Sequence, residues 1–215
     1  MSAATAVWRD RDGREDAFVR AIGAGPTHAA AFEAFQAMLI AENSRMNLVG
    51  ESTLAHFWTR HVVDCAQLLW FAREARVWAD LGSGAGLPGI ILAILLKEVP
   101  GARVHLIESV AKRSRFLSRV VQALDLPAVV HNARAERLGL AGEVVTARAC
   151  APLSRLLTYA APYIQRGALG LFLKGRSAEA EVADAQKSWR FDAEVHASLS
   201  DPAGRVLAIR MLSHA

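Results

Sequence analysis

The spacing of apolar residues predicts helices in the first third of the chain. In residues 28–42, apolar side chains recur every three or four positions, which is the period of an amphipathic helix. Residues 43–50 interrupt this pattern, and residues 52–71 then resume it as a second predicted helix. Residues 1–75 are therefore expected to form an N-terminal helical extension.

From residue 76 onward, short apolar runs alternate with amphipathic segments. The runs predict five strands, at residues 77–80, 104–108, 128–131, 144–148 and 169–174. The intervening segments predict four helices, at residues 88–98, 111–124, 153–165 and 178–189. This alternation is typical of a parallel, doubly wound sheet covered by helices on both faces. Residues 76–215 are therefore expected to form one Rossmann-like α/β domain.

Two more apolar segments complete the pattern. Residues 191–197 and 205–212 flank a turn-rich connection at residues 198–204, which predicts an antiparallel pair and an antiparallel C-terminal strand. No low-complexity linker separates the two regions. We therefore expect the N-terminal helices to pack against the sheet.

Composition narrows the class of protein. A chain of 215 residues with 53% hydrophobic and 21% charged residues is typical of a globular protein. The longest apolar run, residues 90–96, is much shorter than the roughly 20 residues that cross a membrane, and the charged N-terminus does not resemble a signal peptide. We expect a cytoplasmic protein with no membrane partner. Cys65 and Cys150 are far apart, so we expect no metal site and interpret both as small core residues.

The most informative segment is the glycine-rich turn at residues 80–89, which follows the first predicted strand. Gly82, Gly84 and Gly86 alternate in it, and Pro88 begins the next predicted helix. Glycine lets the backbone approach a ligand closely, and proline suits the first turn of a helix. The turn therefore predicts a cofactor site.

Two cofactors fit such a turn, because residues 84–89 also match the dinucleotide pattern G-x-G-x-x-G. Asp80 favours S-adenosylmethionine, since its carboxylate would pair with the methionine ammonium group and repel a pyrophosphate. Glu108 ends the next strand, where it would accept hydrogen bonds from the ribose hydroxyls of either cofactor. A nicotinamide-dependent dehydrogenase thus stays an alternative to a methyltransferase.

With these residues in place, the chain resembles the RsmG (GidB) family, bacterial methyltransferases that act on guanine N7 of small-subunit ribosomal RNA. The resemblance covers roughly residues 30 to 175 and rests on several motifs in order: Asn47-Leu48, Thr59-Arg60-His61-Val62-Val63-Asp64, the turn at 80–89, Glu108-Ser109, Lys112-Arg113-Ser114-Arg115-Phe116-Leu117, Arg134-Ala135-Glu136, Ala147-Arg148-Ala149 and Leu173-Lys174-Gly175. Several spaced motifs are far more specific than one glycine turn.

The resemblance implies a class I methyltransferase fold and roles for named residues. Gly82 and Leu87 would line S-adenosylmethionine, Ala135 and Glu136 would meet its adenine, and Arg148 would lie near the methionine and the target base. The product would be S-adenosylhomocysteine. The implied partner is 16S ribosomal RNA in a small-subunit particle, acted on by a monomer. The candidate RNA-binding residues are His61, Asp64, Lys112, Arg113, Arg115, Arg119 and Lys174.

The target atom simplifies the expected chemistry. Guanine N7 carries a lone pair that attacks without first losing a proton, so no general base is required, and catalysis should consist mainly of positioning. The chain departs from the family pattern at Cys65 and Cys150, but we do not expect a cysteine nucleophile. Two further hypotheses stay open at this point: a methyltransferase for a small molecule, and an RNA-binding protein with a degenerate cofactor fold.

Overall fold

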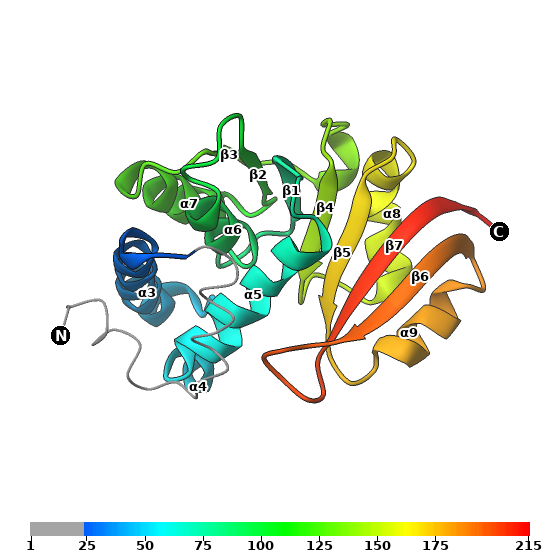
Figure 1. The fold of residues 1–215 in the computed structure, drawn as a ribbon, viewed down its shortest axis with the longest axis horizontal. Coiled ribbons are helices and arrows are strands. Elements are labelled where there is room, and N and C mark those ends of the chain that lie inside the picture. Colours follow the sequence, from blue (N-terminus) through cyan, green and yellow to red (C-terminus); the bar gives the residue numbers. More distant parts are fainter. Residues whose placement is uncertain (1–23) are drawn as a thin grey trace.

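A seven-stranded sheet forms the centre of the computed structural model, which describes residues 24–215 (Figure 1). The part of the expected extension before residue 24 lies outside the described residues. The strands are β1 (Val77–Leu81), β2 (Arg103–Ile107), β3 (Ala128–His131), β4 (Val144–Arg148), β5 (Leu169–Lys174), β6 (Trp189–Ala197) and β7 (Arg205–His214).

The strand order is β3-β2-β1-β4-β5-β7-β6. Strands β1 to β5 run parallel, and β7 runs antiparallel to both β5 and β6. The predicted doubly wound sheet, the antiparallel C-terminal strand and the final strand pair are thus confirmed. The order reverses between β1 and β4, and this switch point is where open α/β sheets bind ligands beyond the carboxyl ends of their strands.

The helices lie on both faces of this sheet, as the alternating pattern predicts (Figure 1). The described chain contains α3 (Pro26–Met46), α4 (Glu51–Leu54), the π-helical segment η1 (Trp58–Val63), α5 (Asp64–Ala66), the 3-10 segment η2 (Gln67–Phe71), α6 (Gly89–Leu95), α7 (Ala111–Ala123), the 3-10 turn η3 (Ala135–Arg137), α8 (Leu153–Ile164) and α9 (Ala178–Ala185).

The expectation of one continuous helix over residues 52–71 is wrong. The segment breaks after α4 and then changes from π-helical to α-helical to 3-10 geometry. Apolar spacing does not distinguish these helix types, because all of them place residues three to five apart on one side. The helix expected over 178–189 is also too long, since α9 ends at Ala185 and β6 begins at Trp189.

Two hydrophobic cores cover the two faces of the sheet. Successive residues of β1 point to opposite faces, so Trp78 packs under α3, α5, α6 and α7, whereas Ala79 packs under α8 and α9. On the first face, Phe32, Phe35 and Leu39 of α3 join the same buried cluster as the strands. The predicted packing of the N-terminal helices against the sheet is confirmed, while the division at residue 75 stays a prediction.

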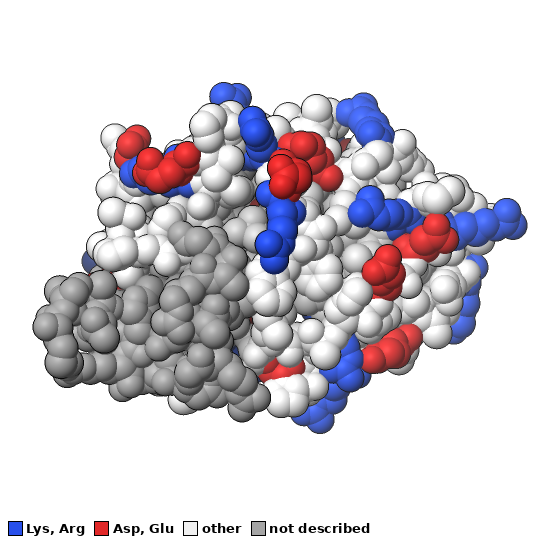
Figure 2. Space-filling view, in the orientation of Figure 1, with Lys and Arg blue, Asp and Glu red and all other residues white. Residues whose placement is uncertain are grey.

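No helix among the described residues is long and apolar enough to cross a membrane. On the part of the face in Figure 2 that is not grey, basic and acidic side chains are interspersed and form no continuous basic patch.

The shared core predicts that α3 unfolds together with the sheet. Phe35 is fully buried, so Phe35→Ala should lower the free energy of unfolding by about 3–5 kcal/mol in urea titrations followed by circular dichroism. The transition should remain single. Ile40→Ala on the same helix is the control, because Ile40 is 48% exposed and its removal should change stability little. An early, separate transition for Phe35→Ala would contradict a common core.

Candidate active site

A cavity of about 850 Å³ lies beyond the carboxyl ends of β1, β4 and β5. Its walls come from the turn after β1, the loops after β4 and β5, the N-terminal helices and the loop between β6 and β7. Eight of the predicted site residues line it: His61, Asp64, Gly82, Gly84, Leu87, Arg113, Arg148 and Lys174. The other predicted site residues are not in its lining: Asp80, Gly86, Glu108, Lys112, Arg115, Arg119, Ala135 and Glu136.

The glycine-rich turn forms the sheet-side wall of the cavity. Gly82 adopts φ 65°, and a Cβ there would come within 2.7 Å of the Cys150 Sγ, so both conformation and space require glycine. The Leu87–Pro88 peptide is cis, and α6 begins at Gly89, one residue later than the sequence predicts. The turn therefore leaves bare backbone facing the cavity.

Asp80 lies beneath this turn and is fully buried. Its Oδ2 accepts a hydrogen bond from the Gly89 N–H at 3.1 Å, and its Oδ1 has no partner among the described residues. Burial raises the pKa of Asp80 to about 7. The direct pairing of Asp80 with a methionine ammonium group stays a prediction, because the carboxyl is outside the cavity lining.

Glu108 holds the same turn from the end of β2. Its Oε2 accepts from the Gly84 N–H at 3.0 Å, and its Oε1 accepts from the Val110 N–H at 2.7 Å. The carboxyl is almost fully buried. Glu108 thus links the turn to the start of α7, and each of its oxygens keeps a second lone pair for a ribose hydroxyl.

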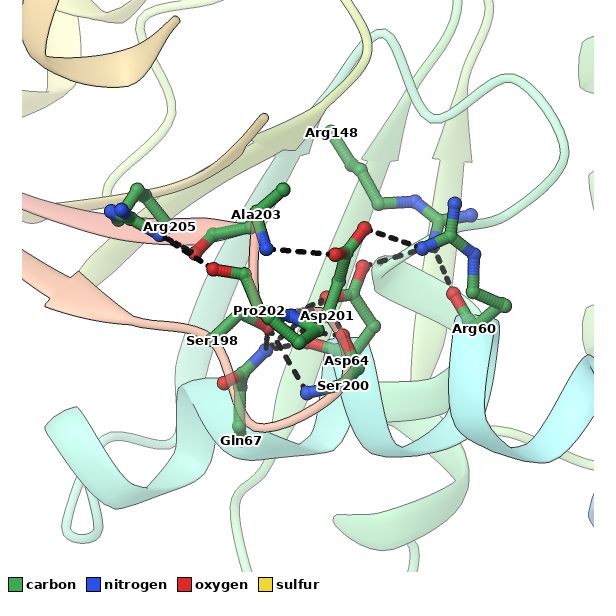
Figure 3. A network of polar contacts seen from close by, with 11 residues as sticks. Arg60, Asp64, Gln67, Arg148, Ser198, Ser200, Asp201, Pro202, Ala203 and Arg205 are labelled. Carbon is green, nitrogen blue, oxygen red and sulfur yellow. Dashed lines mark hydrogen bonds and ion pairs between the residues drawn. The ribbon is translucent and has the colours of Figure 1, made fainter. Parts of the chain in front are cut away.

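Arg148, at the end of β4, connects the sheet to the N-terminal helices (Figure 3). Its Nη1 donates to the Arg60 carbonyl at 2.8 Å and to the Asp64 carboxylate at 3.1 Å. Its Nη2 donates to the His61 Nδ1 at 3.0 Å. The sequence places Arg148 at the ligand edge of the sheet, and the structure shows that its guanidinium binds η1 and α5.

The contact with Arg148 fixes the protonation state of His61. Because a guanidinium only donates, the His61 Nδ1 must accept, and the Nε2 proton then points to the Thr53 Oγ1 at 3.1 Å. Burial, followed by the charge of Arg148, lowers the pKa of His61 to about 4. His61 is therefore neutral at physiological pH, with both ring nitrogens engaged.

Asp64 joins this cluster to the loop between β6 and β7 (Figure 3). Its Oδ1 accepts from the Ser200 hydroxyl at 2.6 Å and from the Gln67 amide at 3.2 Å, while its Oδ2 binds Arg148. Arg60 forms a further ion pair with Asp201 of the same loop at 2.6 Å. The loop therefore closes one side of the cavity.

Lys174 occupies the other side, at the end of β5. Its Nζ donates to the Ala151 carbonyl and to the Glu181 carboxylate, both at 2.7 Å. Glu181 also accepts from the Leu153 N–H at the start of α8. Lys174 is thus held at the cavity wall by α9 and the loop after β4.

The remaining candidates lie farther from the cavity. Arg119 forms an ion pair with Glu42 of α3, whereas Lys112 and Arg115 are exposed on the outer side of α7. Ala135 and Glu136 lie on η3. The two cysteines differ, because Cys65 is buried in the core as expected but Cys150 lines the cavity. Burial raises the pKa of the Cys150 thiol, which disfavours a thiolate nucleophile.

Several cavity residues are not identified as candidates from sequence: Arg60, Thr53, Ser200, Asp201 and Glu181. Thr53, Ser200 and Asp201 lie in short or loop segments whose position depends on tertiary packing. Of these residues, Arg60 could have been found from the sequence, since it directly precedes His61 within the motif at residues 59–64.

Comparison with known proteins agrees with this geometry. Among solved structures, the fold is similar to magnesium protoporphyrin IX methyltransferase from Synechocystis with bound S-adenosylmethionine, with a TM-score of 0.56 and 13% identity over 87% of this chain and 99% of that one. It is also similar to an S-adenosylmethionine-dependent methyltransferase from Aquifex aeolicus, with a TM-score of 0.53 and 16% identity over 72% and 93% of the two chains. The fold is therefore that of the class I methyltransferases, and the cavity lies at its switch point.

Sequence relatives give the family. The family model for rRNA small subunit methyltransferase G (GidB) matches residues 28–206. The ribosomal RNA small subunit methyltransferase G of Caulobacter vibrioides is 53% identical over 196 residues, which is 91% of each chain. The protein of the same name from a Bradyrhizobium species is 42% identical over 179 residues, or 81% of each chain. This chain belongs to the ribosomal RNA small subunit methyltransferase G family, and its cofactor is S-adenosylmethionine.

The buried carboxyl of Asp80 predicts a specific pH dependence of stability. Because its folded pKa of about 7 exceeds the ordinary value of 3.8, the unfolded chain loses this proton first as pH rises. Asp80 therefore costs no stability below about pH 4, and its destabilising effect grows until about pH 7. Asp80→Asn should become progressively more stable relative to the unsubstituted protein over this range in urea titrations.

The matched control is Asp192→Asn, which changes an aspartate of β6 away from the cavity. The stability difference should change more with pH for Asp80→Asn than for Asp192→Asn, because Asp80 is fully buried and Asp192 is exposed. A stability difference for Asp80→Asn that does not change with pH would show that Asp80 ionises in the folded protein as it does in the unfolded chain, and would contradict the prediction.

Proposed function

We propose that this protein transfers the methyl group of S-adenosylmethionine to N7 of a guanine in 16S ribosomal RNA. We further propose that it acts as a cytoplasmic monomer on a small-subunit particle. The cofactor, when bound, supplies a methyl group activated by a sulfonium. The residues of this chain then have to hold the base, orient N7 and exclude water.

The observation that carries this proposal is the state of His61 in the cavity wall. A general base needs a free lone pair and a pKa near neutrality, but the His61 Nδ1 accepts from Arg148 and its pKa is lowered to about 4. The Asp64 carboxylate is likewise committed to Arg148 and Ser200. Asp80, whose pKa is raised to about 7, is outside the cavity lining. The groups in the cavity wall therefore suit an acceptor atom that needs no deprotonation, which is a property of guanine N7.

The two halves of the cavity have different linings, which suit two different ligands. The half at the turn after β1 offers bare backbone, and the buried carboxyls of Asp80 and Glu108 lie behind it, which suits a compact cationic cofactor. The other half is lined by Arg60, Arg148 and Lys174, which suit an anionic substrate that carries phosphates. In this assignment Arg148, at the junction, is a positioning residue that fixes the wall against which the guanine would stack.

The predicted cofactor contacts of Gly82, Gly84, Gly86, Leu87, Ala135 and Glu136 remain part of this proposal. So do RNA contacts by Lys112, Arg115 and Arg119. Lys112 and Arg115 are exposed on α7, where they can meet a backbone beyond the cavity. Arg119 would first have to leave its ion pair with Glu42.

The proposal predicts which substrate accepts the methyl group. With cofactor labelled in its methyl group, small-subunit particles or 16S RNA should yield labelled 7-methylguanosine after digestion and mass spectrometry, whereas free guanosine monophosphate should yield none. The reaction should weaken steeply between about 50 and 200 mM salt as phosphates regain counterions. Arg148→Met, which keeps a side chain of similar length but removes the guanidinium, should transfer the methyl group more slowly, because it loses the contacts that hold the cavity wall.

Three results would decide against the proposal or refine its partner. Label on an exocyclic amine, a ribose or another base would contradict the N7 assignment. Efficient, salt-insensitive methylation of a small molecule would favour the hypothesis of a small-molecule methyltransferase. Activity on naked RNA but not on particles would contradict the proposed particle substrate.

A further inference from the structure

One cation in the cavity has no partner within the described part of the chain. Four arginine or lysine side chains line the cavity, and three are paired with carboxylates: Arg60 with Asp201, Arg148 with Asp64 and Lys174 with Glu181. The fourth is Arg113, whose Nε is buried without a hydrogen-bond partner. A buried, unpartnered donor is costly, so it indicates a group that binds there when the site is filled.

The position of Arg113 is set by α7. Leu117 lies one helical turn later on the same side, and its Cδ2 would be 3.2 Å from a Cβ placed on Gly86. The side of α7 that carries Arg113 and Leu117 therefore faces the glycine-rich turn. Because helical side chains lean toward the N-terminus of their helix, Arg113 extends past the turn to the cavity.

The chemistry of the cofactor identifies the group that fits. S-adenosylmethionine carries a single anionic group, the carboxylate of its methionine moiety, and the planar fork of a guanidinium matches a carboxylate with two parallel hydrogen bonds. The carboxyls of Asp80 and Glu108 accept hydrogen bonds from backbone N–H groups, so they supply no cation for that carboxylate. We propose that Arg113 binds the methionine carboxylate of S-adenosylmethionine.

This assignment separates Arg113 from the other basic residues of α7. Lys112, Arg115 and Arg119 are exposed, whereas Arg113 is only partly accessible and its Nε is shielded. An RNA phosphate approaches from outside and would favour the exposed side chains. The sequence groups Arg113 with them as an RNA-binding candidate, and the structure gives it a different neighbourhood at the turn.

The test compares two cofactors that differ only in this carboxylate. Isothermal titration calorimetry, without RNA, would measure binding of S-adenosylmethionine and of decarboxylated S-adenosylmethionine to the unsubstituted protein, Arg113→Met and Arg113→Lys. Arg113→Met should weaken S-adenosylmethionine binding by about tenfold or more and leave decarboxylated cofactor binding unchanged. Arg113→Lys should restore part of the affinity, since it keeps the charge but not the fork.

Arg115→Met is the matched control on the exposed side of α7, and both cofactors should bind it as they bind the unsubstituted protein. Unchanged S-adenosylmethionine affinity in Arg113→Met would overturn the assignment, and a weaker RNA interaction in that variant would then indicate a phosphate contact. Equal loss of both cofactors would also overturn it, because that result shows a general disturbance of the site. The inference depends only on cofactor binding. It can therefore fail while the proposed transfer to guanine N7 is correct, and it can be correct while that transfer is not.

Discussion

The guanidinium of Arg148 is the constraint on which the architecture of the cavity depends. It stands at the carboxyl end of β4 and donates to Arg60, His61 and Asp64, three groups contributed by one short helical stretch. Asp64 also accepts a hydrogen bond from Ser200, which lies in the loop between β6 and β7. Because one charge is shared by three segments far apart in sequence, the wall of the cavity forms only when all three have folded into place.

The same interaction determines the chemistry open to the site. A histidine beside a carboxylate is a familiar acid–base pair. Here, however, the Arg148 guanidinium donates to the His61 Nδ1 and forms an ion pair with the Asp64 carboxylate. In the proposed function, the site therefore positions groups and does not remove protons. Beneath it, the buried carboxyls of Asp80 and Glu108 hold the glycine-rich turn in shape through backbone N–H groups. Polar groups thus maintain the structure on both sides of the cavity.

The strands, the turn at residues 80–89 and the end-of-strand positions of Glu108 and Arg148 could be predicted because each depends on local periodicity or on one edge of a parallel sheet. The partners of Arg148 could not, since they follow from the change of helix type in η1 and α5. The loop carrying Ser200 and Asp201 could be predicted only as a turn. Arg113 shows the same limit, because its charge is visible in sequence, whereas the burial of its Nε away from any acceptor of the described chain is a property of the packing.

A double-mutant cycle between Arg148 and Asp64 tests most directly whether this interaction assembles the cavity. Arg148→Met, Asp64→Asn and the double variant would be compared by their rates of methyl transfer to small-subunit particles, with folding checked by circular dichroism. We predict that the double variant is no slower than the worse single variant, since either change alone removes the shared contact. Rates that fall by the product of the two separate effects would show that Arg148 and Asp64 act independently, and would contradict the account.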